Sequence, residues 1–389
     1  MIRRQFLLSA TAALVIAFPA FAADTVKVGL VLPMSGPFSQ YGQQMQNGIK
    51  LFMKEHGDVV AGKKIEFIIK DDGGIAPDRA RRAVQDLIVR DKVDVLVGFT
   101  FTASALAAAP LAKEADKAMI VLNATSSGIT AANPYMIRIG QTLPQITEPA
   151  GHYAGAQGYK TIYTVVADIT AGHDAEAAFT RGLKAAGGEV AGTLRVPAQN
   201  PDFAPFVQRI KDGKPDAVFT WLPPGEATIN FIKEFNQRGL SAENIVMLGT
   251  GDLTDELTIE QTGEAGIGVV TTGHYSMAHK SPKNQAFVKA YLAEFPNDKW
   301  PNFMSVSAYD GMAALYRGLE KTGGNASGPA LVAALKGEKF ESPRGPIEID
   351  AKTRDIVQTV YVRKVERVDG TLANVEFQEF PASRDSASH

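Results

Sequence analysis

Short apolar runs alternate with amphipathic segments along most of the chain. Runs typical of buried strands lie at Val26–Leu32, Ile65–Lys70, Val93–Gly98 and Met119–Leu122. Between them, helical spacing of apolar residues predicts helices at Gln43–His56, Pro77–Asp91 and Ala103–Asp116. Strands that alternate with helices of this length predict right-handed crossovers and a parallel sheet covered on both faces.

A second series of the same kind begins near Thr147, without a detectable repeat of residues. We expect its strands at Thr161–Ala167, Val190–Val196, Ala217–Trp221 and Ile245–Leu248, and its helices at Asp174–Ala186, Asp202–Lys211 and Gly225–Arg238. The chain then turns helical at Asn284–Phe295, Ser305–Lys321 and Gly328–Leu335, and ends in strands at Gly345–Asp350 and Val357–Val368. The last segment alternates like a half-exposed edge strand.

The predicted fold is α/β, with two doubly wound parallel-sheet lobes. The helices after residue 284 have no strands of their own to cover, so the chain must cross between the lobes more than once. We expect a first lobe of residues 25–143 plus 272–342 and a second of residues 144–271 plus 343–381. Segments rich in Gly, Pro, Ser or Thr mark three crossings, at Gly140–Pro149, Val270–Tyr275 and Glu341–Gly345. Lobes joined in this way hinge and close on something.

The first residues have the pattern of a secretory signal peptide, residues 1–22. Two arginines precede an apolar run, and Ala20 and Ala22 flank a small-residue cleavage site after Ala22. The alternative, a retained membrane helix, is disfavoured because the run is shorter than the ~20 residues that a span needs. The double arginine leaves both the general and the twin-arginine export route open. No cysteine follows the cleavage site, so lipid attachment there is excluded.

Composition excludes several classes of partner and of site. The chain has 389 residues, 45% of them hydrophobic, and its 40 basic and 42 acidic side chains give a net charge of -2. Without a dense basic run, nucleic acid is not expected as a partner. The chain contains no cysteine, which excludes disulfides, thiolate metal sites and cysteine nucleophiles.

Hydroxyl-rich loops follow the strands of the first lobe. In parallel sheets, ligands bind at the carboxyl ends of strands, where helix N-termini present free N–H groups. Three loops lie at such ends: Pro33–Gly42, Gly98–Ala105 and Leu122–Gly128. The last two offer hydroxyls and amides without a basic side chain, which suits a carboxylate better than a phosphate. The alternative is plain N-capping by Ser and Thr.

Three loops of the second lobe are further candidates, at Gly172–Asp174, Trp221–Glu226 and Gly249–Glu256. In the first, His173 is read as a solute contact, a base or a capping residue. The Gly-x-Gly of the third is weak as a nucleotide site because Thr254 replaces the last glycine.

The pair Asp71–Asp72 is read as a turn rather than a metal site. No catalytic motif assembles, so we expect neither an enzyme nor a metal or cofactor.

Several stretches resemble one known family. They are "VGLVLPMSGPFSQYGQQMQNGIKL", "DVLVGFTFTASALAAAPLAKEADKAMIVLNATSSGIT" and "VVADITAGHDAEAAF". They are similar to the periplasmic leucine/isoleucine/valine-binding proteins, the solute receptors of branched-chain amino acid ABC transporters. The likeness runs from Val26 to about Phe380. It implies a type I two-lobe fold with three crossings that closes around a small solute.

The resemblance also implies site residues in the first lobe. In this family the solute carboxylate is held by a hydroxyl residue after the third strand and by the "AT" loop. The matching positions are Thr102, Asn123 and Thr125. The tyrosine of the opening turn, which lines the pocket, matches Tyr41.

In the second lobe the sequence departs from the family. Amino-acid binders receive the α-ammonium with an acidic and an aromatic side chain, and the matching positions hold Gly251 and Pro224, with Ala171 in place of another aromatic. Asp252 and Glu226 lie one or two residues away, so an amino acid stays possible. A buried, uncompensated cation would cost several kcal/mol. We therefore expect a carboxylate with an apolar or aromatic body, such as a benzoate, between walls drawn from the remaining aromatic candidates: Phe101, Trp221 and Tyr275.

The resemblance implies a periplasmic receptor that delivers its small carboxylate solute to a membrane permease. Because no heptad run or long apolar stripe argues for a stable dimer, we expect a monomer. The alternative is an exported enzyme or a sensory receptor domain on the same fold, with His173 and Asp252 facing each other across the cleft.

Overall fold

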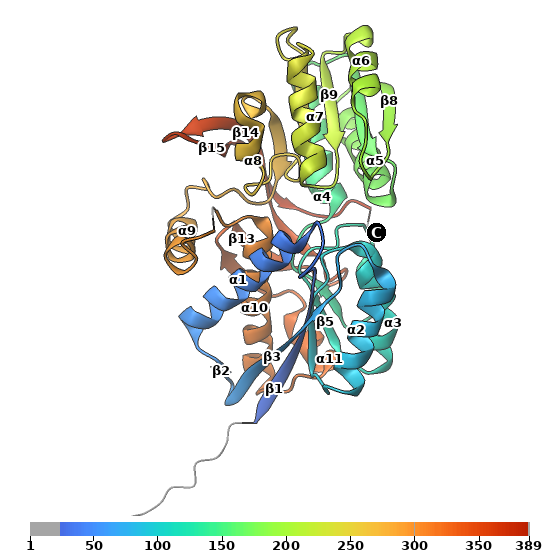
Figure 1. Cartoon of the computed structure of the whole chain (residues 1–389). Coiled ribbons are helices and arrows are strands. Elements are labelled where there is room, and N and C mark those ends of the chain that lie inside the picture. Colours follow the sequence, from blue (N-terminus) through green and yellow to red (C-terminus); the bar gives the residue numbers. More distant parts are fainter. Residues whose placement is uncertain (1–23, 299, 388–389) are drawn as a thin grey trace, which may run out of the picture.

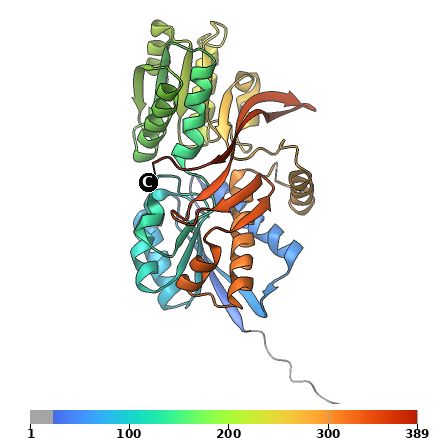
Figure 2. The same cartoon turned by 180° about the vertical axis from the view of Figure 1, so that it is seen from behind.

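The computed structural model describes residues 24–298 and 300–387. They form two lobes that lie end to end, and the last strands of the chain run across the junction (Figures 1 and 2). This is the predicted α/β fold with two lobes, each built on a sheet with a parallel core. The predicted signal peptide lies outside the described residues.

The sheet of the first lobe has the strand order β2-β3-β1-β4-β5-β6, in which only β2 runs antiparallel to its neighbour. Its strands are β1 (Thr25–Leu32), β2 (Val59–Val60), β3 (Lys63–Asp71), β4 (Val95–Gly98), β5 (Ala118–Val121) and β6 (Met136–Arg138). Its helices are α1 (Ser39–His56), α2 (Pro77–Val89), α3 (Thr102–Glu114), α9 (Pro282–Glu294), α10 (Phe303–Thr322) and α11 (Gly328–Leu335).

Successive side chains of these strands point to opposite faces of the sheet, and helices cover both faces. In β1, Val28 and Leu30 join the core beneath α1 and α10, whereas Val31 points to the core beneath α2 and α3. Because both faces are buried, the strands read as nearly continuous apolar runs in the sequence.

The sheet of the second lobe combines a parallel part with antiparallel additions. The parallel part has the order β11-β10-β9-β7-β8, and β12, β13, β14 and β15 add to it through antiparallel pairs. The parallel strands are β7 (Ile162–Ala167), β8 (Val190–Val196), β9 (Ala217–Trp221), β10 (Val246–Thr250) and β11 (Val270–Gly273). The additions are β12 (Lys339–Ser342), β13 (Gly345–Ile349), β14 (Ile356–Val368) and β15 (Thr371–Ser383). The helices are α4 (Leu143–Ala156), α5 (Thr170–Ala185), α6 (Ala204–Gly213), α7 (Glu226–Gln237) and α8 (Ile259–Thr262).

The long strand β14 carries the chain from one lobe to the other. Its first residue, Ile356, belongs to the core of the first lobe together with Ile347 of β13, whereas Val360 and Val362 belong to the core of the second. The structure therefore places the last crossing inside β14, later than Glu341–Gly345. β14 is also not the edge strand that its alternation predicts, because β11, β13 and β15 all pair with it.

The first crossing contains a helix that the sequence reading assigned to a loop. Thr142 and Gln145 form a reciprocal capping box at the start of α4, with Gln145 N donating to Thr142 Oγ1 at 3.1 Å. Pro144 stands in the first turn, where its missing N–H costs nothing. The glycines and prolines that indicated a loop are thus compatible with this helix.

A buried arginine ties the crossings together. Arg344 donates to the carbonyl oxygens of Ile139 and Gly140 at 2.7 and 3.2 Å and to Gln358 Oε1 at 2.8 Å. Its Nε lies 2.9 Å from Asp310 Oδ2 of α10. One guanidinium therefore holds the first crossing, the start of the last crossing and a helix of the first lobe in fixed relation.

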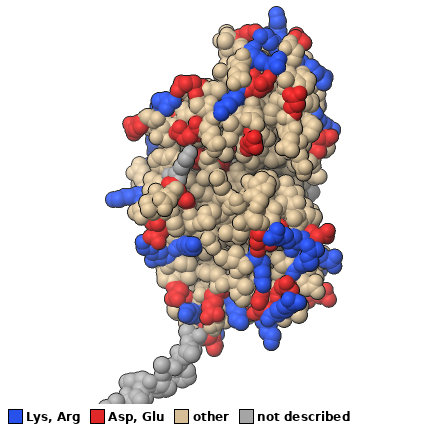
Figure 3. All heavy atoms as spheres, viewed as in Figure 1, with Lys and Arg blue, Asp and Glu red and all other residues tan. Residues whose placement is uncertain are grey.

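Charged side chains are unevenly spread over the surface. Figure 3 shows Lys and Arg gathered where α2 and α3 lie, including the exposed Arg79, Arg81 and Arg82, while the centre of that face is largely uncharged. Within the described residues, none of the helices combines the length and the apolar character that crossing a bilayer requires.

Replacing Arg344 by methionine should destabilise the protein strongly. The change leaves Asp310 buried without its ion pair, and breaking such a pair costs about 3 to 5 kcal/mol. The free energy of unfolding from urea denaturation checks this, with Lys339→Met as control, because the Lys339 side chain is 72% exposed in its pair with Glu348. A loss below about 1 kcal/mol, the range of exposed pairs, would contradict the role of Arg344.

Candidate functional site

The loops after β4 and β5 are joined by hydrogen bonds at the carboxyl end of the first sheet. Asn123 Nδ2 donates to Thr100 O at 2.9 Å, and Ser126 N donates to Thr102 Oγ1 at 3.2 Å. A tight turn makes this possible: Gly98 has φ +124°, and a Cβ there would lie 2.2 Å from Val31 O. The structure thus brings the predicted residues Thr102 and Asn123 into one loop pair.

The "AT" loop is backed by a buried arginine that the sequence reading missed. Arg138, at the end of β6, donates to the carbonyl oxygens of Ala124 and Ser126 at 2.8 and 2.6 Å. Its Nε also donates to Asp355 Oδ1 at 2.9 Å. Thr125 is fixed at its carbonyl oxygen by Leu143 N, at 2.8 Å. The carbonyl groups of the "AT" loop thus point toward Arg138 and α4, which hold the loop on that side.

A row of aromatic rings lies beside these loops. Phe101 is 4.7 Å from Phe38 between ring centroids, Phe38 is 6.4 Å from Tyr41, and Tyr41 is 6.4 Å from Phe303. Burial, reinforced by the charges of Asp255 and Asp252, raises the pKa of Tyr41 well above its usual value. The predicted residues Tyr41 and Phe101 therefore belong to one wall, with a neutral phenol.

At the opposing lobe, Trp221 and Asp252 meet at the ends of two neighbouring strands. Trp221 Nε1 donates to Asp252 Oδ2 at 3.3 Å, and Thr250 Oγ1 donates to the same oxygen at 2.9 Å. Asp252 is 6% exposed. Burial raises the pKa of its carboxyl, and the hydrogen bonds from Thr250 and Trp221 oppose that rise.

Gly251 lies against a buried guanidinium. A Cβ at Gly251 would be 2.9 Å from Arg363 Nη2. Arg363 is 2% exposed, donates from Nη2 to Thr271 Oγ1 at 3.1 Å and from Nη1 to Tyr275 O, and its Nε has no hydrogen-bond partner among the described residues. Gly251 stands at the position matched to the acid of amino-acid binders. Its lack of a side chain leaves room there for the guanidinium of Arg363.

Two polar groups of the segment that follows β11 are buried without partners in the described part of the chain. They are the hydroxyl of Tyr275, a predicted site residue, and Nε2 of His274, which the sequence analysis did not single out. Burial and the charges of Arg344 and Arg363 lower the pKa of His274 well below its usual value, so its ring is neutral. His274 also packs edge-on against Phe303 at 5.9 Å. Its place directly after β11 is the signal that could have identified it.

The two lobes touch through the loop that follows β10. Asn302, the N-cap of α10 in the first lobe, donates from Nδ2 to Asp255 Oδ2 at 3.0 Å. Leu257 of the same loop packs against the core of the first lobe. These contacts join the loop that carries Asp252 to the first lobe.

Two predicted residues are not brought into this group. His173 Nε2 lies 2.8 Å from Asp168 Oδ1, its side chain is 42% exposed, and it lines a groove of the second lobe with Glu176 and Arg195. His173 and Asp252 stand in the same lobe, each with its own partners, so they do not face each other across a cleft. Pro224 is half-buried in the loop between β9 and α7.

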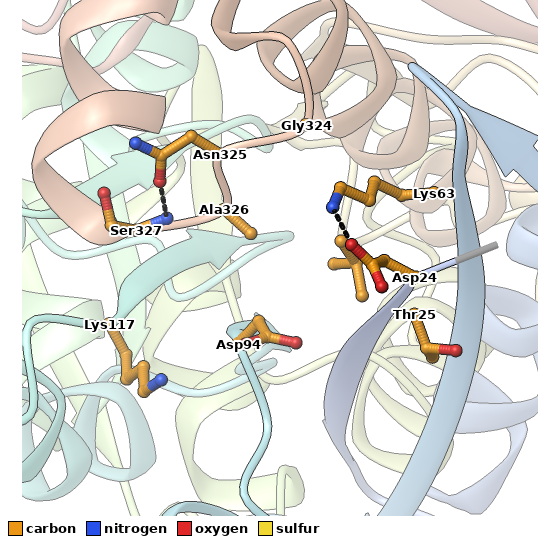
Figure 4. Close-up of a pocket in the computed structure, with 10 residues that line it drawn as sticks. Asp24, Thr25, Lys63, Asp94, Lys117, Gly324, Asn325, Ala326 and Ser327 are labelled. Carbon is orange, nitrogen blue, oxygen red and sulfur yellow. Dashed lines mark hydrogen bonds and ion pairs between the residues drawn. The ribbon is translucent and has the colours of Figure 1, made fainter. Parts of the chain in front are cut away.

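A polar pocket at the far end of the first lobe is separate from this site. It is lined by Asp24, Lys63, Asp94 and Lys117 among others, and Lys63 Nζ lies 2.8 Å from Asp24 Oδ2 (Figure 4). Because β1 and β4 begin here, the pocket lies at the amino edge of the sheet, opposite the loop of Thr102. Within residues 24–298 and 300–387, His, Asp and Glu form no group suited to a metal ion.

Comparisons with known proteins agree with this architecture. Residues 25–371 match the periplasmic binding protein family. The Leu/Ile/Val-binding protein homolog 6 of Brucella melitensis is 39% identical over 383 residues, 98% of each chain. The chain therefore belongs to the periplasmic binding protein family, as an ABC-type solute-binding protein of the Leu/Ile/Val group. Members of this family are exported, which fits the predicted signal peptide.

Two solved structures are particularly similar. A solute-binding protein of an ABC transporter from Rhodopseudomonas palustris BisB5, in complex with 3,4-dihydroxy benzoic acid, is 49% identical with a TM-score of 0.90, covering 94% of this chain and 100% of that one. Another from Rhodopseudomonas palustris HaA2, in complex with p-hydroxybenzoic acid, is 40% identical with a TM-score of 0.89, covering 93% and 99%.

The contact between Asp255 and Asn302 leads to a pH prediction. Burial and the charge of Glu256 raise the pKa of Asp255 well above its usual value. The folded chain then binds more protons than the unfolded chain, so this carboxyl makes folding less favourable as pH rises through its folded pKa. Asp255→Asn should therefore be more stable than the parent at about pH 8, by roughly 1 kcal/mol or more, and this advantage should shrink toward about pH 5.

Urea denaturation of both proteins across this range measures the difference, in which the pH effects of groups that do not interact with Asp255 cancel. Asp212→Asn, on the exposed face of α6, serves as the control with no pH-dependent difference. A variant that is less stable at high pH, or an advantage that grows on acidification, would contradict the raised pKa.

Proposed function

We propose that this protein captures an aromatic carboxylate between its two lobes and delivers it, as a monomer, to an ABC permease. In this proposal the signal peptide is removed after Ala22 and the mature protein works in the periplasm. The first lobe holds the carboxylate through the loop pair of Thr102, Asn123 and Thr125, and the ring lies between Tyr41 and Trp221.

The observation that carries the proposal is the guanidinium of Arg363 beside Gly251. An α-amino acid brings an ammonium group, and a buried cation needs a carboxylate close to it. At Gly251 it would meet another cation instead. Of the neighbouring acids, Asp255 already accepts from Asn302, and Asp252 accepts from Thr250 and Trp221 at one of its two oxygens. A solute with a carboxylate and an uncharged body avoids this conflict.

The similar structures support the same class of solute. The two proteins from Rhodopseudomonas palustris hold hydroxylated benzoic acids. Closure would follow from contacts that the solute makes with both lobes at once, which favour the closed state over the open one.

Thermal melts of the mature protein against a panel of solutes test this function. Because only the folded state binds, a solute at a hundred times its dissociation constant stabilises the protein by about 2.7 kcal/mol. We expect benzoate and hydroxybenzoates to raise the melting temperature and leucine, isoleucine and valine to leave it unchanged. A shift with the amino acids and none with the aromatic acids would overturn the proposal.

Thr102→Val should weaken binding of the aromatic acid. The change removes a hydroxyl that would donate to a carboxylate, and hydrogen bonds to charged groups contribute about 1.5 to 3 kcal/mol, so the affinity should fall about tenfold or more. Calorimetric titration measures the loss. The matched change Thr322→Val, in the last turn of α10, should leave the affinity unaltered. Equal affinities for the two variants would remove Thr102 from the site.

A further inference from the structure

One oxygen of Asp252 is held by two donors while the other has none from a side chain in the described part of the chain. Trp221 and Thr250 both donate to Oδ2, at 3.3 and 2.9 Å. They come from neighbouring parallel strands, in which Thr220 pairs with Gly249. The carboxylate is therefore oriented by the ends of two strands, and its Oδ1 accepts from none of the described side chains.

This acceptor stands opposite the aromatic row of the first lobe. Burial raises the pKa of the Tyr41 phenol, and the charges of Asp255 and Asp252 add to that rise, although these acids belong to the other lobe. The loop that carries Asp252 continues into Asp255, which bonds directly to Asn302 of the first lobe. Asp252 thus lies on the wall that faces the ring-binding side of the first lobe.

We propose that Asp252 binds the end of the solute remote from its carboxylate, by accepting a hydrogen bond from a hydroxyl group on the ring. Trp221 and Thr250 act as positioning residues that fix the acceptor. This inference rests on the proposed function, since it assigns specificity within the same site.

The chemistry of the surroundings favours a neutral donor over an ammonium group. Arg363 lies within electrostatic reach of Asp252 and would repel a second cation. An apolar end would offer Oδ1 no donor, so the hydrogen bond that a hydroxyl makes to a charged oxygen would be lost. A hydroxyl satisfies the oxygen and adds no charge to the enclosed space.

The degree of selectivity follows from the same geometry. Sites whose polar groups are left wholly unpaired by the wrong ligand discriminate by about 10⁴ or more. Here Oδ2 keeps both of its donors when the hydroxyl is missing, so the penalty is smaller. A single hydrogen bond to a charged group corresponds to about tenfold to hundredfold in affinity.

Calorimetric titration of the mature protein with para-hydroxybenzoate and para-methylbenzoate tests the inference. The two acids are nearly equal in size and differ in the hydrogen-bond donor. The parent protein should bind the hydroxyl compound about tenfold to hundredfold more tightly. In Asp252→Asn this ratio should fall to within about threefold of one, because the hydroxyl loses its charged acceptor and the para-methyl group no longer faces a charged oxygen.

Thr250→Val provides a second readout that keeps the carboxylate. Releasing one of the two donors should lower the ratio by a smaller factor, without loss of para-methylbenzoate binding. Asp212→Asn on α6 is the matched control and should leave the ratio at its parental value. Equal affinities for the two acids in the parent, or a ratio that survives in Asp252→Asn, would overturn the role of Asp252. If neither acid binds the parent, the proposed function itself fails.

Discussion

An ion enclosed between two lobes must find its counterpart there, because water no longer stabilises it. The interlobe region of this protein already contains several charged side chains. Asp252, Asp255 and Glu256 are buried on one loop, and Arg363 is the guanidinium within electrostatic reach of all three. In the proposed function these charges select the solute more than the shape of the cleft does. The solute carboxylate is then held by neutral donors of the first lobe rather than by the groups of this loop.

The fold brings the loops that carry these groups together at the ends of strands. The loops of Thr102 and Asn123 follow β4 and β5, and those of Trp221, Asp252 and His274 follow β9, β10 and β11. In both sheets these are the carboxyl ends of parallel strands, where loops are free to present polar groups. Arg344 fixes the crossings between the lobes, and Arg138 fixes the back of the "AT" loop. Buried arginines thus set the geometry, while in the proposed function uncharged donors bind the solute.

The sequence predicts the parallel elements well because their signal is local. The helix at Gly328–Leu335 has the predicted ends, and β1 begins one residue before its prediction. The helix α4 was missed because its glycines and prolines also indicate a loop. β14 was misread as an edge strand because its pairing with β13 and β15 depends on segments elsewhere in the chain.

The site shows the same division between local and distant signals. Thr102, Asn123 and Tyr41 stand in loops that can be recognised by their place after a strand. The roles of Arg363 and Arg138 depend on contacts with residues far away in the sequence, such as Thr271 and Ala124, and no local pattern reveals them. His173, in contrast, stands in a recognisable loop, yet its side chain pairs with Asp168 at the surface.

A crystal structure of the protein with para-hydroxybenzoate tests the central claim most directly, because it shows which lobe receives the negative end of the solute. The account predicts the carboxylate at Thr102 and the loop after β5, the ring between Tyr41 and Trp221, and the hydroxyl at Asp252. A carboxylate bound at Arg363 with the hydroxyl toward Thr102 would contradict it.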